Sequence, residues 1–173
     1  AQYVEQRKFP LPLMEKGALI APKSSGGGYV DKFRNRIMFP IQDARGHVIA
    51  FAGRTLGADQ PKYLNSPETA LFRKSRLLYN FHAARAEMKR QGQVVVFEGY
   101  ADVIKAWMAG VHNGVATMGT ALTEEHALLL RRSAERVVIC YDGDDAGQSA
   151  AYKSLHILEK AGLDIKVAVL PNR

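Results

Sequence analysis

The chain has 173 residues, of which 47% are hydrophobic and 24% are charged, and its net charge is +7. This composition can build one sizeable core or two small ones, and it excludes an intrinsically disordered chain. No apolar run approaches the roughly 18 residues of a membrane span, and the single cysteine, Cys140, excludes a disulfide scaffold and a cysteine-based metal site.

The positive charge is concentrated in the first half of the chain. Residues 1–92 hold 16 Lys and Arg against 7 Asp and Glu, whereas residues 93–173 hold 8 against 10. This asymmetry favours a polyanionic partner such as nucleic acid or nucleotide phosphate, and a solvated basic face is the alternative that charge alone leaves open. The first residues lack the basic start and apolar stretch of a secretory signal, so a cytoplasmic protein is expected.

The first half reads as a small α+β unit. One or two helical turns are expected at residues 11–17, which begin near a proline and stop at a glycine. Residues 24–28 (SSGGG) predict a turn and not a phosphate loop, because strand-like residues follow them. Two β-type runs, at residues 36–41 and 48–52, predict an antiparallel hairpin around the turn sequence DARG.

Cationic residues surround this hairpin. Lys32, Arg34 and Arg36 stand at alternate positions, so in an extended chain their side chains would point to one side. The loop-rich residues 53–76 then interleave polar, aromatic and cationic side chains.

From residue 80 onward, helices and strands alternate. Helices are predicted at residues 81–90, 101–109, 123–132 and 146–161, and strands at residues 94–97, 115–117, 137–141 and 165–170. Continuous apolar strands separated by helices predict a parallel sheet covered on both faces. The fold class is therefore α/β, with a basic α+β lobe at residues 1–91 followed by a compact α/β unit at residues 92–173.

Several single residues are expected to be structural. The five histidines show no spacing typical of metal ligands, and Cys140 is expected to act as a small buried hydrophobe in its strand. Helical core positions are predicted for Trp107, Met108, Leu128, Leu129 and Leu155.

Acidic residues follow two of the predicted strands. Glu98 comes directly after the strand at 94–97, and Asp142 and Asp144 follow the strand at 137–141. Sites in open α/β sheets form beyond the carboxyl ends of the strands, so these carboxylates are expected to converge. Their repulsion is relieved by protonation or by a divalent cation, and Mg²⁺ suits an open rim. Helix capping is the alternative, and it is as good as metal binding for Asp102 and Asp145.

Longer motifs contain these acids. The segments EGYADV (98–103) and YDGDDAG (141–147) resemble the two acidic signatures of the Toprim domain, which topoisomerases, primases and certain nucleases and recombination proteins share. Upstream, FRNRIMFPI (33–41), GR (53–54), PKYLNSPET (61–69) and LLYN (77–80) are similar to the catalytic core of bacterial DnaG-type primases. The resemblance covers nearly the whole chain, and this ordered series of motifs is specific.

The resemblance implies a DNA-templated RNA polymerase that makes short primers on single-stranded DNA by two-metal nucleotidyl transfer. Matching positions make Glu98, Asp142 and Asp144 the residues that bind the catalytic Mg²⁺, with Mn²⁺ as a substitute. In the family the basic motifs face this site, and the positions implicated in holding nucleotide phosphates and nucleic acid are Arg34, Arg36, Arg54, Lys62, Tyr63, Asn65 and Lys74. The implied partners are the single-stranded DNA template, ribonucleoside triphosphates, the RNA primer and a replicative helicase at the bacterial replication fork, with no membrane.

The chain also departs from the family pattern. The family's zinc-binding and helicase-binding domains are not in this sequence. The zinc ion and the helicase contact that the resemblance implies would belong to those domains. A further Asp-Pro-Asp motif follows the strand corresponding to residues 165–170 in the family, whereas this sequence ends at residue 173. We therefore expect a core from a longer protein that lacks part of the metal site, so ligand binding without catalysis stays open.

Three other functions fit parts of the sequence. A topoisomerase or nuclease of the same fold would cut DNA, but none of the seven tyrosines can be assigned a transesterifying role. A non-enzymatic scaffold would use the acids for structure and the basic lobe for a polyanion. A phosphatase of the haloacid-dehalogenase type would need a nucleophilic Asp where this chain has Glu98.

Overall fold

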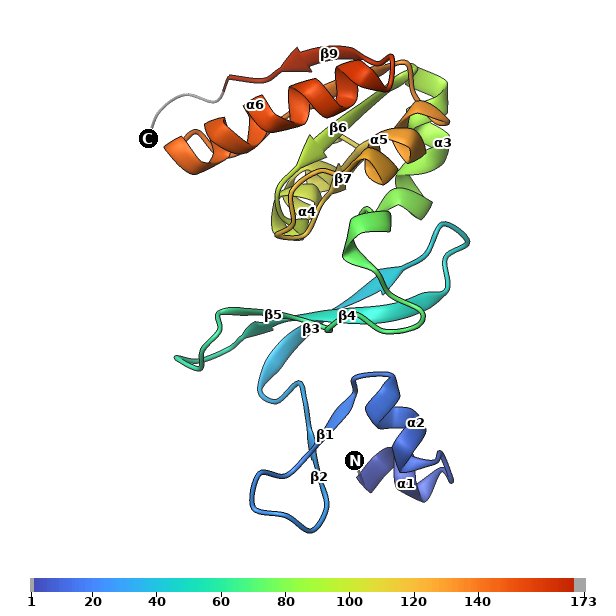
Figure 1. Ribbon diagram of the computed structural model, residues 1–173, viewed down its shortest axis with the longest axis vertical. Coiled ribbons are helices and arrows are strands. Elements are labelled where there is room, and N and C mark those ends of the chain that lie inside the picture. Colours follow the sequence, from blue (N-terminus) through green and yellow to red (C-terminus); the bar gives the residue numbers. More distant parts are fainter. Residues whose placement is uncertain (1, 170–173) are drawn as a thin grey trace. The chain divides into compact units, whose positions relative to one another are not determined.

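The computed structural model describes residues 2–169 (Figure 1). The chain divides into two compact units, the first made of residues 1–41 and 48–73 and the second of residues 42–47 and 74–173. Helix α3 thereby groups with the second unit, because it buries Phe81, Ala84 and Met88 in that unit's core. The domain boundary expected between residues 91 and 92 stays a prediction.

The first unit contains short helices and two small sheets. Its elements are α1 (Gln2–Gln6), α2 (Leu11–Lys16), β1 (Ile20–Pro22), β2 (Tyr29–Asp31), β3 (Arg36–Gln42), β4 (Val48–Thr55) and β5 (Tyr63–Asn65). Strands β1 and β2 pair antiparallel around the glycine-rich turn, and the second sheet has the order β3-β4-β5. The predicted helix, the predicted turn at residues 24–28 and the predicted hairpin are present, whereas α1 was not predicted.

The second unit is a parallel sheet with helices. Its elements are η1 (Lys74–Arg76), α3 (Phe81–Gln91), β6 (Gln93–Phe97), α4 (Tyr100–Met108), β7 (Gly114–Ala116), α5 (Glu124–Arg131), β8 (Arg136–Ile139), α6 (Asp145–Lys160) and β9 (Asp164–Val167). The sheet order is β7-β6-β8-β9, and every pairing is parallel. The predicted α/β class and the alternation of helices and strands are confirmed.

Alternation along β6 divides the core between the two faces of this sheet. Val94 and Val96 pack with residues of α3, α5 and α6 in the larger cluster. Phe97, on the other face, packs with Val103 of α4 in a smaller cluster, against which Val95 also packs. Successive residues of a strand point to opposite faces of the sheet. Because both faces of this sheet are covered, every position from Val94 to Phe97 is apolar.

Several detailed predictions were wrong. The third predicted strand ends at Ile139, because Cys140 and Tyr141 already belong to the irregular segment that leads to α6. Cys140 is half-buried against the smaller cluster. The fourth strand ends at Val167, and Leu170 lies outside the described residues.

The predicted core positions on the helices were only partly right. Leu129 and Leu155 pack against the large cluster. Trp107, Met108 and Leu128 are exposed. Trp107 lies at the last turn of α4, where its ring contacts that of His112, with 4.5 Å between the ring centroids.

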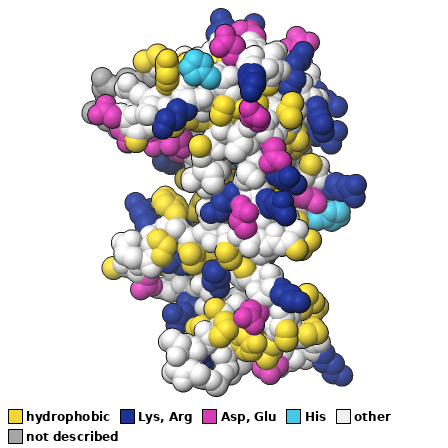
Figure 2. Space-filling view, viewed as in Figure 1, with side chains coloured by type: hydrophobic (Ala, Val, Ile, Leu, Met, Phe, Trp, Pro, Cys, Tyr) yellow, Lys and Arg dark blue, Asp and Glu magenta, His cyan; other side chains and the backbone are white. Residues whose placement is uncertain are grey.

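Charged side chains are interspersed on the surface. On the face drawn in Figure 2, Lys and Arg alternate with Asp, Glu and neutral atoms and do not merge into one patch. In residues 2–169 no helix is long and apolar enough to cross a membrane.

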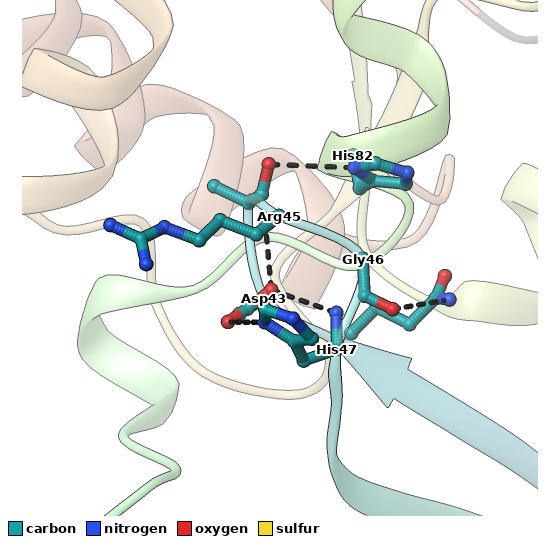
Figure 3. A network of polar contacts seen from close by, with 7 residues as sticks. Asp43, Arg45, Gly46, His47 and His82 are labelled. Carbon is teal, nitrogen blue, oxygen red and sulfur yellow. Dashed lines mark hydrogen bonds and ion pairs between the residues drawn. The ribbon is translucent and has the colours of Figure 1, made fainter.

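The tip of the β3–β4 hairpin is a closed, hydrogen-bonded turn next to α3 (Figure 3). The Asp43 carboxylate accepts hydrogen bonds from the backbone N–H groups of Arg45 at 2.8 Å and His47 at 3.0 Å. The His82 ring lies 3.4 Å from the carbonyl oxygen of Ala44. His47 and His82 thus have local structural contacts in this turn.

Candidate metal and nucleic-acid-binding sites

Glu98 and Asp142 meet at one edge of the parallel sheet. Glu98 directly follows β6, and Asp142 follows the neighbouring strand β8 after a two-residue turn. The Glu98 Oε1 atom accepts a hydrogen bond from the backbone N–H of Asp142 at 3.0 Å. The structure therefore brings together the two acidic strand ends, as the parallel topology requires.

Asp144 caps helix α6. Its Oδ1 atom accepts a hydrogen bond from the backbone N–H of Gly147 at 2.8 Å. Capping and cation binding are compatible, because a carboxylate has a second oxygen with its own lone pairs. Asp102 and Asp145 lie in the first turns of α4 and α6, where acids are favoured by the helix dipole.

Gly147 permits this close approach. A Cβ atom built on it would overlap the carbonyl oxygen of Asp142 and would lie 2.8 Å from the Glu98 Oε1 atom. Helix α6 can therefore start this close to the end of β8 only with a glycine here. Gly147 was not among the predicted site residues, although a glycine in the first turn of a predicted helix was the available signal.

The acids perturb one another. The pKa of the Glu98 carboxyl is raised by its partial burial and by the negative charges of Asp142, Asp144 and Asp102, while the hydrogen bond from the Asp142 N–H opposes the rise. The repulsion favours any bound cation that would neutralise it.

The donor set fits a hard divalent cation at an open position. Within residues 2–169 no three His, Cys, Asp or Glu side chains form a ready-made metal cage. Mg²⁺ needs no such cage, because it usually keeps several waters and binds one or two carboxylates together with substrate phosphates. Carboxylate oxygens from Glu98, Asp142 and Asp144 are chemically suited to that arrangement.

Three cations line a cavity of about 490 Å³ in the first unit. Lys32, Arg34 and Arg36 surround it. The remaining lining residues are Asp59, Gln60, Pro61 and Leu64. Lys32 was one of the three alternating cations in the sequence but was not among the predicted binding residues.

The extended chain assumed for Lys32, Arg34 and Arg36 was wrong, although the three side chains line one cavity. The chain is not extended between Lys32 and Arg36, because Asn35 has a φ of 51°. Arg36 also has a structural role, since its Nη1 atom donates to the carbonyl oxygens of Pro61 at 2.8 Å and Gly53 at 3.3 Å. A guanidinium has five N–H donors, so these two bonds leave capacity for a phosphate.

Arg54, Lys62 and Tyr63 form a second group. The antiparallel register of β4 and β5 places Arg54 opposite Tyr63. The guanidinium carbon of Arg54 and the Nζ atom of Lys62 each lie 5.9 Å from the Tyr63 ring centroid. Asn65 is two residues along the same strand and is paired with Ala52.

Lys74 belongs to the other unit, where it begins η1 and is half-buried. The seven predicted binding residues are therefore distributed over two groups in the first unit and one turn in the second. Their role in binding stays a prediction.

Comparison with known proteins identifies the families that the chain resembles. Residues 1–85 match the DNA primase catalytic core, N-terminal domain, and residues 92–169 match the Toprim domain. The DNA primase of Halalkalibacterium halodurans is 53% identical over 158 residues, which are 91% of this chain and 26% of that protein.

Solved structures agree in fold. The RNA polymerase domain of Mycobacterium tuberculosis primase DnaG matches with a TM-score of 0.88 at 32% identity, covering 99% of this chain and 58% of that one. A DnaG primase catalytic domain bound to single-stranded DNA matches with a TM-score of 0.85 at 39% identity, covering 94% and 51%.

The chain spans about a quarter of the length of the curated relatives that it matches. The two family matches together cover nearly all of its residues, in the order in which the sequence motifs occur. The chain belongs to the DnaG-type DNA primase family, and it comprises the N-terminal domain of the catalytic core and the Toprim domain.

Proposed function

We propose that this chain is the part of a DNA primase, a nucleotidyltransferase, that holds divalent cations and the incoming ribonucleotide during RNA primer synthesis on single-stranded DNA. The observation that carries the proposal is the convergence of Glu98 and Asp142, where the Glu98 Oε1 atom accepts a hydrogen bond from the Asp142 backbone N–H at 3.0 Å, with Asp144 two residues further on. Family membership supports primase over a topoisomerase, nuclease or phosphatase, because the similar proteins are DNA primases.

The reaction requires no protein nucleophile. The 3′-hydroxyl of the growing primer attacks the α-phosphorus of a ribonucleoside triphosphate and loses its proton to solvent. A new P–O bond forms, and pyrophosphate leaves with the electrons of the broken bond. When bound, Mg²⁺ would stabilise the charge that develops on the attacking and leaving oxygens. Glu98, Asp142 and Asp144 would hold that ion, with Mn²⁺ as a substitute, from the edge of the sheet.

The basic residues would bind phosphate and sugar. Arg34 and Arg36 carry forked guanidinium groups that match phosphate oxygens, and Lys62 supplies a point charge. Tyr63 has an exposed ring beside two cations, which suits stacking with a base or contact with a sugar. The remaining members of the proposed set are Arg54, Asn65 and Lys74.

The proposed partners are single-stranded DNA, ribonucleoside triphosphates and the RNA primer. Support comes from the similar DnaG catalytic domain that was solved bound to single-stranded DNA. In a full-length protein we further propose contact with the replicative helicase through another domain, a separate zinc-binding domain, and action at the replication fork in the bacterial cytoplasm.

A metal-binding experiment tests the proposal. Mn²⁺ binding, followed by electron paramagnetic resonance, should be lost in Asp142→Ala and retained in Asp145→Ala, which removes a neighbouring exposed acid. Asp142→Ala should keep the wild-type melting temperature, since Asp142 bonds to Glu98 through its backbone N–H, and Asp145→Ala should lose about 0.3–1 kcal/mol at most with its favourable charge at the start of α6. Equal Mn²⁺ affinity in the two variants would show that Glu98, Asp142 and Asp144 do not form the metal site.

A further inference from the structure

Two side chains at the start of α5 form hydrogen bonds with the backbone of the basic turn η1. The Thr123 hydroxyl donates to the carbonyl oxygen of Ser75 at 2.6 Å. The His126 Nε2 atom lies 2.8 Å from the carbonyl oxygen of Lys74 and 3.1 Å from that of Leu77. Three carbonyl groups of one short turn thus accept hydrogen bonds from two side chains at the start of a helix about fifty residues further along the chain.

The hydrogen-bond network fixes the state of the histidine. The His126 Nδ1 atom accepts from the backbone N–H of Thr123 at 3.3 Å, so in the neutral ring the proton resides on Nε2, which donates to the carbonyls. The ring is completely buried. A buried polar ring is tolerated because both of its nitrogens are satisfied.

A capping box alone would not require a histidine. The usual residue at this third helical position is Glu or Gln, whose single end group reaches back to the N-cap backbone. His126 makes that contact through one nitrogen and bridges to η1 through the other. The second contact serves η1 and not α5, because α5 already has its cap.

The turn that is held in this way is basic and follows an irregular segment. Residues 66–73 form no helix or strand, so no ladder of backbone bonds fixes the approach to Lys74. An ion pair of 2.8 Å joins Arg76 to Glu125 of α5, but both side chains are about half exposed, so it contributes little. The buried bonds of Thr123 and His126 therefore fix the backbone of the turn itself, while the backbone bond from Tyr79 to Ala116 at 2.8 Å and the buried Leu78 hold the residues that follow it.

We propose that His126, with Thr123, is a positioning residue that fixes the Lys74 backbone so that its ammonium group can contact a nucleic-acid phosphate. This inference rests on the proposed function, because it assumes that Lys74 binds the polyanion. His126 itself does not touch the ligand and acts through η1.

Four variants test the proposal by fluorescence anisotropy with a labelled single-stranded oligonucleotide. Lys74→Ala should weaken binding about fivefold or more and lower the salt slope by about 0.7, the value for one phosphate contact on a single strand. His126→Gln keeps an acceptor for the Thr123 N–H but loses the opposite nitrogen, so it should weaken binding by a similar factor. The double variant should bind no more weakly than Lys74→Ala. His156→Gln, at an exposed position of α6, is the matched control and should bind like wild type.

The outcomes separate the two claims. Wild-type binding by His126→Gln, or additive losses in the double variant, would overturn the positioning role while Lys74 kept its own. Wild-type binding by Lys74→Ala would overturn the assignment of Lys74 to the proposed site and the inference with it. A far-ultraviolet circular dichroism melt of each variant identifies any loss of affinity that comes from unfolding.

Discussion

Gly147→Ala is expected to damage the acidic edge of the sheet. The added methyl group would overlap the Asp142 carbonyl and press on the Glu98 carboxylate, so α6 must shift from the end of β8. Such overpacking costs about 1–3 kcal/mol. Loss of the partly exposed hydrogen bond between the Asp142 N–H and Glu98 adds about 1 kcal/mol, and the helix preference of Ala offsets about 1 kcal/mol.

The net loss of unfolding free energy is therefore about 1–3 kcal/mol, which lowers the melting temperature by roughly 3–10 °C in a chain of this size. Differential scanning calorimetry measures that shift, and Mn²⁺ affinity should fall in the same variant. Ser149→Ala, at an exposed position of the same helix, is the control and should not lose stability. If Gly147→Ala were as stable as this control and bound Mn²⁺ like wild type, the tight junction between α6 and β8 would not exist.

Three further perturbations address the cap, the buried histidine and a basic side chain. Asp144→Asn should leave the melting temperature nearly unchanged, because Asn caps helices as well as Asp does, yet it should weaken Mn²⁺ binding in a titration; a large loss of stability would contradict the cap geometry. The pKa of His126 is lowered from 6.5 by burial, against the opposing effects of its bonds to the Lys74 and Leu77 carbonyls and of the Glu125 charge. Protonation then favours the unfolded chain, so the free energy of unfolding should fall as the pH drops below about 6.5. This fall should be smaller in His126→Gln, and urea titrations of both proteins at several pH values would measure it. Lys62→Ala should weaken binding to single-stranded DNA and flatten its salt dependence, whereas Lys89→Ala, on the exposed side of α3, should not.

The order of elements could be predicted because its signals are local. The apolar runs at Val94–Val96 and Val137–Ile139 alternate with helical segments, and this pattern alone specifies a parallel sheet. Because β6 and β8 are parallel neighbours, this topology places Glu98 and Asp142 at the same end of the sheet. Family resemblance, and not periodicity, supplied the nucleic-acid-binding set.

Other features depend on tertiary contacts that a linear pattern does not contain. The exposure of Trp107 and Met108 reflects their place at the last turn of α4, after the helix has buried Tyr100 and Val103. The bridge from His126 to η1 joins residues about fifty positions apart, so no local motif reports it. The position of Asp144 in the sequence suited both metal binding and helix capping, and only its hydrogen bond to the Gly147 N–H identifies it as a cap.

The measurement that bears most directly on the central claim is the binding of a fluorescent ribonucleoside triphosphate with and without Mn²⁺. Wild-type protein should be compared with Glu98→Gln, whose side-chain oxygen can still accept the hydrogen bond from Asp142 while the charge is removed. We predict binding that depends on the metal in the wild type and that loses this dependence in the variant. Binding that ignores both the metal and Glu98 would contradict the account, and the chain would then be a polyanion-binding scaffold whose acids serve only its fold.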